Sequence, residues 1–214
     1  MYPNLEFAAI SLSSIFFIVD PLGTSPVFLA ITEGKSAAER KRTAFRASLV
    51  TFLILLVFAF VGEWILKLLR VTISSFQIAG GILIFTIALS MLQARRSRAK
   101  STPQEEHEKQ EGDDVAIFPL AIPMLSGPAA ITTVMVLINL STSPQHRMLV
   151  ILAIALTSLF CYLILRASGR LLNLLGQTGI NVLTRLMGLL LAVISVQLVI
   201  DGIKAAFLGI SPGK

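Results

Sequence analysis

Two short stretches place prolines, glycine and small hydroxyl residues inside apolar segments, where a regular helix disfavours them. The first, D-P-L-G-T-S-P, covers residues 20–26, and the second, P-M-L-S-G-P, covers residues 123–128. In each stretch two prolines lie five residues apart. Proline removes a backbone donor and clashes with the carbonyl four residues back. In hydrocarbon an unsatisfied backbone group is costly, so such a break persists only where protein or water satisfies it.

We expect each break to expose a new helix N-terminus. The predicted restarts are at Pro26 and Pro128, because a residue able to cap a helix precedes each proline and proline costs nothing at the first helical position. Free N–H groups and the positive end of the helix dipole suit an anion such as a carboxylate. The carbonyls near Val19 and Ile122, where the preceding halves end, suit an ammonium group or a cation. One site between the breaks can therefore hold both ends of a zwitterion.

The side chains around the breaks form the candidate substrate site. A charge such as that of Asp20 costs roughly 2.5–3.5 kcal/mol at the centre of a span, so it should face the break or water. We interpret Asp20 as a carboxylate that binds an ammonium group or carries a proton; the alternative is that it caps the backbone around Pro21. Serine and threonine hydroxyls can instead bond back to their own helix. The expected substrate-binding residues are Asp20, Gly23, Thr24, Ser25, Ser126, Gly127 and Thr132, and the expected helix-breaking residues are Pro21, Pro26, Pro123 and Pro128.

The composition is that of an integral membrane protein. Hydrophobic residues make up 55% of the chain and charged residues 14%, with a mean hydropathy of +0.82. A soluble domain has about 45–50% apolar and about 25% charged residues. The 18 basic residues outnumber the 12 acidic ones. In so apolar a chain this excess is better explained by anchoring of cytoplasmic loops than by a nucleic-acid partner.

Stretches between charges predict six membrane-spanning helices, at residues 7–32, 47–62, 71–94, 115–145, 148–165 and 186–200. Of the 18 Lys and Arg residues, 13 fall in the first, third and fifth connections. Because positively charged loops remain in the cytoplasm, both termini should face the periplasm or the exterior. We therefore expect a multi-pass protein of the bacterial inner membrane.

We expect one membrane domain over residues 1–214. Residues 95–114 carry basic residues at the start and acidic residues toward the end, which predicts a cytoplasmic linker. They separate two sets of three spans, at residues 1–94 and 115–214. With an odd number of spans in each half, homologous halves would sit in opposite orientations.

Matching motifs support such a repeat. The proline pairs of the two halves match at an offset of 102 residues, and residues 77–80 match 185–188 at an offset of 108. The predicted fold is an all-α membrane protein of two inverted three-helix repeats, with helices 1 and 4 broken near the midplane. Small residues such as Gly80, Gly81 and Gly188 are expected to allow close helix packing.

The chain resembles the MarC family of bacterial inner-membrane proteins, also called the small neutral amino acid transporter family. The resemblance rests on D-P-x-G-x-x-P at residues 20–26, I-A-G-G at 78–81, P-L-A-I-P-M-L-S-G-P-A-A-I at 119–131 and T-G-I-N-V-L-T-R-L-M-G at 178–188. It implies six spans and, for some members, proton-linked movement of glycine, alanine and similar amino acids. Many members have asparagine where this chain has Asp20, and glycine where it has Ala129.

The leading functional hypothesis is a secondary transporter for small neutral amino acids of the glycine, alanine and serine type, working by alternating access with protons as the candidate coupling ion. The alternatives are a half-helix channel for a small solute and a membrane scaffold without transport activity. No histidine lies in an expected span and no second membrane-centred carboxylate accompanies Asp20, so we expect no enzyme. No metal or other cofactor is expected, and an oligomer is compatible with the sequence.

Overall fold

The computed structural model describes residues 4–68, 70–93 and 116–208. This part of the chain is helical and contains no strand. The elements are α1 (Asn4–Val19), α2 (Pro21–Ile31), α3 (Ala37–Leu68), α4 (Ile73–Leu92), the π-helix η1 (Ala116–Leu125), α5 (Pro128–Leu140) and α6 (Pro144–Leu208).

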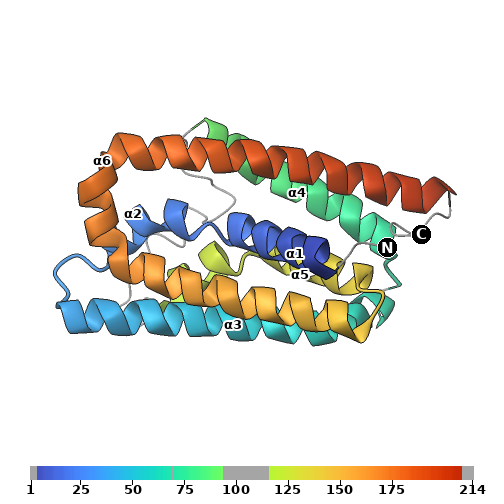
Figure 1. The fold of residues 1–214 in the computed structure, drawn as a ribbon, viewed down its shortest axis with the longest axis horizontal. Coiled ribbons are helices and arrows are strands. Elements are labelled where there is room, and N and C mark those ends of the chain that lie inside the picture. The colour runs from blue at the N-terminus through green and yellow to red at the C-terminus, as the bar shows by residue number, and fades with distance from the viewer. Residues whose placement is uncertain (1–3, 69, 94–115, 209–214) are drawn as a thin grey trace.

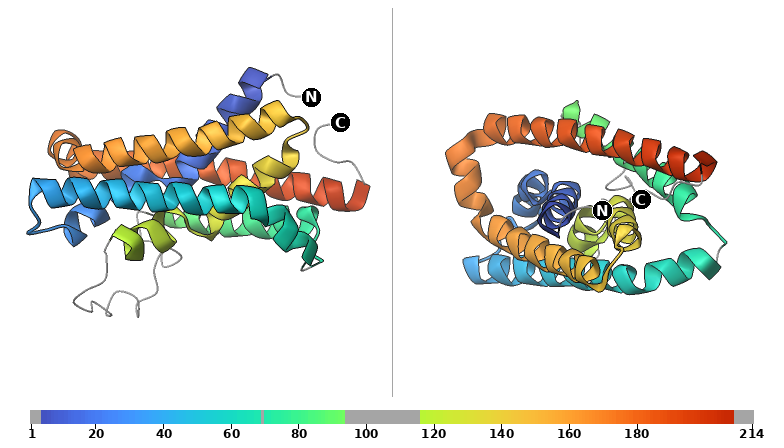
Figure 2. Two further views of the ribbon diagram at one scale, coloured as in Figure 1. Left: turned by 90° about the horizontal axis from the view of Figure 1, so that it is seen from below. Right: turned by 45° about the vertical axis from the view of Figure 1, so that its right-hand side comes forward.

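The two broken helices lie inside a frame made by the long helices. Figure 1 shows α6 passing along the molecule twice, with α3 beside its first arm (Pro144–Leu171) and α4 beside its second arm (Asn181–Phe207). The right-hand view of Figure 2 shows α1 and α5 enclosed by α3, α4 and α6. Eight of the 13 residues of α5 are buried. A helix buried on all sides belongs to the centre of a bundle, so the breaks are surrounded by protein.

The two arms of α6 run in opposite directions. The helix is interrupted at Gly176, whose φ of 63° and ψ of 173° are not helical. A positive φ combined with a ψ near 180° is essentially restricted to glycine. Residues 166–185, which the sequence predicted as a connection, are therefore largely helical. As a result α1 begins and α6 ends at the same end of the molecule (Figure 1).

Five helices of the described part of the chain are long and apolar enough to cross a membrane, namely Asn4–Ile31 with its break, Ala37–Leu68, Ile73–Leu92, and the two arms of α6. The predicted span at 115–145 is instead divided between η1 and α5, and the 13 residues of α5 reach only about 20 Å at 1.5 Å each. His146, which lies outside the spans expected from the sequence, is buried in the first turn of α6 and stacks on Phe7 with ring centroids 4.3 Å apart.

Helix α3 extends beyond the predicted span at 47–62 at both ends. At its start Ser36 and Glu39 cap each other: the Ser36 N–H donates to Glu39 Oε2 (2.8 Å), and the Glu39 N–H donates to Ser36 Oγ (3.3 Å). This reciprocal pair is a capping box. The predicted span was bounded by charged residues, but charged residues do not end a helix. The observed helix is therefore longer than the uncharged stretch.

Small residues recur every seven positions on α4 and on the second arm of α6, and they face each other in antiparallel register. The facing pairs are Ser74 with Gly202, Gly81 with Ser195, and Ala88 with Gly188. A Cβ at any of the three glycines would lie 2.8–3.0 Å from the facing carbonyl oxygen. Small residues allow such close approach of membrane helices. The predicted packing role of Gly81 and Gly188 is confirmed.

Candidate functional site

The first break is formed by Asp20. This residue adopts a left-handed conformation, with φ 50° and ψ 62°, between the end of α1 and the start of α2. Its Oδ1 accepts a hydrogen bond from the Gly23 N–H at 2.9 Å, and its carbonyl accepts one from the Thr24 N–H at 3.1 Å. The side chain is 3% exposed. Asp20 is thus the N-cap of α2, as in the alternative role that the sequence left open.

The predicted restart at Pro26 is wrong. Pro21 occupies the first turn of α2, and Pro26 lies inside that helix. Ser25, expected to cap a helix at this point, instead donates from Oγ to the Pro21 carbonyl at 2.8 Å. Both dipeptides satisfy the sequence rule for a helix start, but only aspartate, with asparagine and glycine, enters the left-handed region readily. The chain therefore turns at Asp20.

The break removes helical donors from the carbonyls at the end of α1. The Phe17 carbonyl would accept from residue 21, but Pro21 has no N–H. The Val19 carbonyl would accept from Gly23, whose N–H is bonded to the Asp20 side chain. The predicted end of this half at Val19 is confirmed, and its last turn directs carbonyl oxygens into the break.

The second break lies between η1 and α5, where Gly127 is the N-cap and Pro128 occupies the first turn of α5. The predicted restart at Pro128 is confirmed. The preceding half continues to Leu125, three residues beyond the predicted end at Ile122. Ser126 closes it by donating to the Ala121 carbonyl from both N (2.9 Å) and Oγ (2.7 Å). Pro123 lies within η1, and π-helical turns are frequently found at functional sites.

The N-termini of α2 and α5 differ in how they are capped. Gly127 has no side chain and makes no side-chain cap. The first helical bond of α5 is donated by Ile131 to the Gly127 carbonyl, at 3.1 Å. The N–H groups of Ala129 and Ala130 precede it and so lie outside the helical ladder. An anion can bind there, whereas at α2 the Asp20 carboxylate already accepts one of the corresponding donors.

The two broken helices run antiparallel. Helix α1 packs against α5, and α2 packs against η1. In Figure 1 the chain passes from α1 to α2 in one direction and from η1 to α5 in the other. The breaks consequently lie at about the same level of the bundle, and the N-termini of α2 and α5 are directed toward the centre from opposite sides.

The expected substrate-binding side chains lie in this buried region but are engaged differently. Ser25 and Ser126 donate to carbonyls of their own segments. The Thr24 hydroxyl is fully buried and has no hydrogen-bond partner. Thr132 is 5% exposed and faces α4, where a Cβ at Gly80 would overlap its Cγ2 methyl. Among these side chains, Thr24 is the one whose hydroxyl is fully buried and unpaired, which makes it a candidate ligand-binding group.

Gln77 was not among the substrate-binding residues expected from the sequence. Its side chain on α4 is 1% exposed, and its Oε1 has no hydrogen-bond partner. Its Cβ lies in the close contact with α6 at Gly202. An amide in the middle of an apolar stretch was the available signal. Among the described residues, no group of three or more His, Cys, Asp or Glu gathers where it could hold a metal ion.

The model of the MarC family of integral membrane proteins matches residues 5–207. The UPF0056 membrane protein MJ1677 of Methanocaldococcus jannaschii is 40% identical over 205 residues, covering 96% of this chain and 100% of that protein. The UPF0056 membrane proteins YhcE of Escherichia coli (39% identical, 92% and 91% of the two chains) and YvbG of Bacillus subtilis (40% identical, 91% and 92%) are similarly close. No solved structure matches the chain. A family match over nearly the whole length, with such relatives, shows that the chain belongs to the MarC family of integral membrane proteins.

Proposed function

We propose that this protein is a secondary transporter that moves small neutral amino acids, of the glycine, alanine and serine type, across the bacterial inner membrane. The observation that carries the proposal is the antiparallel pair of broken helices buried at the centre of the bundle. In transporters, half-helix N-termini bind anionic substrate groups, and unwound backbone carbonyls bind cations. The basic end of the molecule faces the cytoplasm, and both termini face away from it.

The groups at the two breaks complement a zwitterion. The N–H groups of Ala129 and Ala130 and the dipole of α5 bind the substrate carboxylate. The carbonyls of Phe17 and Val19 accept from the substrate ammonium group. Thr24 Oγ1, buried without a partner, completes the polar lining. The breaks themselves consist largely of small residues, among them Gly23, Ser126 and Gly127, so a substrate with a short side chain is the one proposed.

Asp20 couples transport to protons in this proposal. It is the only buried carboxylate among the described residues. When it is protonated, the acceptor for the Gly23 N–H is weakened, because a carboxylic acid is a poorer acceptor than a carboxylate. Proton binding therefore loosens the cap of α2 and changes the geometry of the break.

Alternating access follows from two inverted repeats in this proposal. Aligning the two observed restarts, Pro21 with Pro128, gives an offset of 107 residues, close to the 108 of the motifs at 77–80 and 185–188. In this alignment the proline pairs matched at an offset of 102 residues are not equivalent positions. The helices that this proposal treats as equivalent also pack against each other in antiparallel orientation. The two broken helices form one such pair, and α4 and the second arm of α6 form the other. A two-fold axis in the membrane plane produces this arrangement.

The test is uptake of labelled glycine and alanine into proteoliposomes, with and without an imposed pH gradient. Wild type should accumulate label and respond to the gradient. Asp20→Asn should retain uptake and lose the response, because asparagine can cap the helix but cannot exchange a proton. Asp201→Asn is the matched control, since Asp201 accepts from Gln197 at 2.9 Å on α6, away from the breaks.

Folded protein that takes up no neutral amino acid would overturn the proposal. Uptake that never saturates with substrate concentration would assign the protein to the channels. Saturable uptake by wild type that ignores the pH gradient would remove proton coupling and leave the amino acid site in place.

A further inference from the structure

A basic cavity lies at one end of the molecule, remote from the two breaks. Its volume is about 570 Å³, and it lies between the end of α2, the start of α3 and the end of the first arm of α6. Pockets of about 300–1,000 Å³ are the usual size for small ligands. Its floor is formed by Phe28, Leu165 and Ser168, each at most 1% exposed. The cationic residues that line it are Arg40, Lys41, Arg166 and Arg170.

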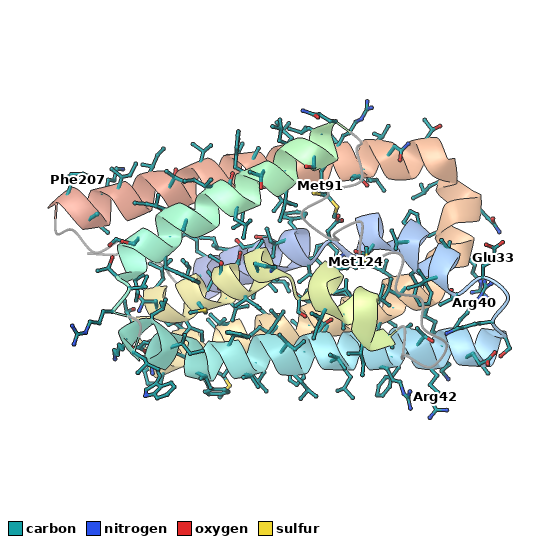
Figure 3. The ribbon with its side chains drawn as sticks, turned by 180° about the vertical axis from the view of Figure 1, so that it is seen from behind. Glu33, Arg40, Arg42, Met91, Met124 and Phe207 are labelled. Carbon is teal, nitrogen blue, oxygen red and sulfur yellow. The ribbon has the colours of Figure 1, made fainter. Side chains whose placement is uncertain are left out.

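These four cations have no acidic counterpart in the described part of the chain. None forms an ion pair there; the ion pair at the other end of α3 joins Lys67 to Glu63. Arg40 donates from Nε to the Thr32 carbonyl at 3.2 Å, which fixes the base of its guanidinium. Glu33 lies at the same end (Figure 3), but no described ion pair includes it. The cavity therefore carries net positive charge and complements an anion.

The cavity lies at the charged ends of two membrane-length helices. It lies where two membrane-length helices meet, at the start of α3 and near the end of the first arm of α6. Phe45 and Tyr162 form an edge-to-face pair across these helices, with ring centroids 5.9 Å apart. They lie one helical turn from Lys41 and Arg166, about 6 Å toward the membrane interior. Tyrosine is enriched in such a layer at the membrane–water interface.

We propose that this cavity binds the phosphate headgroup of an anionic phospholipid. Guanidinium groups bind phosphate through paired, charge-assisted hydrogen bonds, and basic pockets between membrane helices bind anionic headgroups. The phosphate lies among the cations of α3 and α6. The glycerol and acyl chains extend over the ring of Phe45, which is 54% exposed. The adjacent apolar surface distinguishes a lipid from a soluble phosphate as the occupant. This site does not depend on the transport proposal.

The test is native mass spectrometry of delipidated protein titrated with phosphatidylglycerol and with phosphatidylcholine of the same acyl chains. The cavity variant combines Lys41→Gln, Arg166→Gln and Arg170→Gln and leaves Arg40 in its bond to Thr32. All three residues are exposed, so the fold should persist. The control combines Arg42→Gln, Arg147→Gln and Lys204→Gln, which are also exposed, do not line the cavity and remove equal charge. Figure 3 shows Arg42 on the opposite side of α3 from Arg40.

Wild type should bind phosphatidylglycerol at least about tenfold more tightly than phosphatidylcholine, since each basic residue contributes about a fivefold effect at a membrane surface. The control should keep this preference and the cavity variant should lose it. Equal binding of the two lipids by wild type, or a preference that survives in the cavity variant, would overturn the proposal. Displacement of phosphatidylglycerol by millimolar glycerol phosphate would identify a soluble phosphate as the ligand and would equally reject the lipid.

Discussion

Asp20 and Gly23 are joined by a hydrogen bond in which the Gly23 N–H donates to the Asp20 carboxylate, with N and Oδ1 2.9 Å apart. The bond closes the first turn of α2 from a residue that is itself left-handed. A single side chain therefore ends α1, redirects the chain and caps the next helix. None of these tasks requires a negative charge, because the amide oxygen of asparagine is also an acceptor.

The first prediction concerns replacements of Asp20. Asp20→Asn should unfold at nearly the wild-type temperature, since asparagine both caps a helix and adopts the left-handed region. Asp20→Ala should lose about 1 kcal/mol from the missing cap and a further ~1–2 kcal/mol from left-handed strain. Asp20→Gly should fall between them. Thermal unfolding in detergent measures the order, and an asparagine variant as unstable as the alanine variant would show that the charge, not the cap, holds the break.

The second prediction tests the contact between Asp20 and Gly23. A Cβ at residue 23 would overlap the Asp20 carboxylate, so Gly23→Ala should destabilise the wild type. In an Asp20→Gly background the carboxylate is absent, and the same substitution should stabilise by about 0.5–1 kcal/mol, because alanine favours a helix over glycine.

Unfolding free energies of the four proteins in this cycle measure the coupling. The substitution should change sign between the two backgrounds. An identical effect of Gly23→Ala in both would mean that the carboxylate does not occupy this position.

The third prediction separates two neighbouring hydroxyls. Thr24 Oγ1 is buried without a partner, so Thr24→Val removes an unsatisfied group and should raise the unfolding free energy by about 1 kcal/mol or more. Ser25 Oγ donates to the Pro21 carbonyl, so Ser25→Ala should lower it by about 1 kcal/mol. If Thr24 binds substrate as proposed, Thr24→Val should also reduce glycine uptake. A destabilised valine variant would show that the hydroxyl bonds within the fold.

The positions of the helix breaks were only partly predictable from the sequence. Proline, glycine and aspartate in apolar stretches predicted that two helices would be interrupted, and both are. The restart at Pro128 was predicted correctly, but the one expected at Pro26 lies five residues earlier, at Pro21. Local rules permit a start at either Asp20 or Ser25. The conformation of Asp20 decides between them, and residue type alone does not determine it.

The sequence predicted that glycines would allow close helix packing, but it did not predict which residues would face them. Glycines at 80, 81 and 188 predicted close helix contacts, and each lies in one. That Gly81 faces Ser195 while Gly80 faces Thr132 depends on how α4 is rotated between α5 and α6. This rotation is set by the shapes of three helices together. For the same reason Gln77 was not among the expected substrate-binding residues, and the basic cavity, which three segments share, could not be predicted.

The last prediction concerns the contact of α4 with α5. A Cβ at Gly80 would overlap the Cγ2 methyl of Thr132, so Gly80→Ala should destabilise the protein and move α5. Thr132→Ser removes that methyl, keeps the hydroxyl and should suppress the effect. Gly169→Ala is the control, because nothing lies within 4 Å of its added Cβ. It should be neutral or stabilise by up to about 1 kcal/mol.

Thermal unfolding of the Gly80→Ala and Thr132→Ser single variants and of the double variant measures the coupling. Equal destabilisation with and without the methyl would place the close contact elsewhere. Because α5 presents its N-terminus to the breaks, Gly80→Ala should also reduce glycine uptake, and Thr132→Ser should restore it.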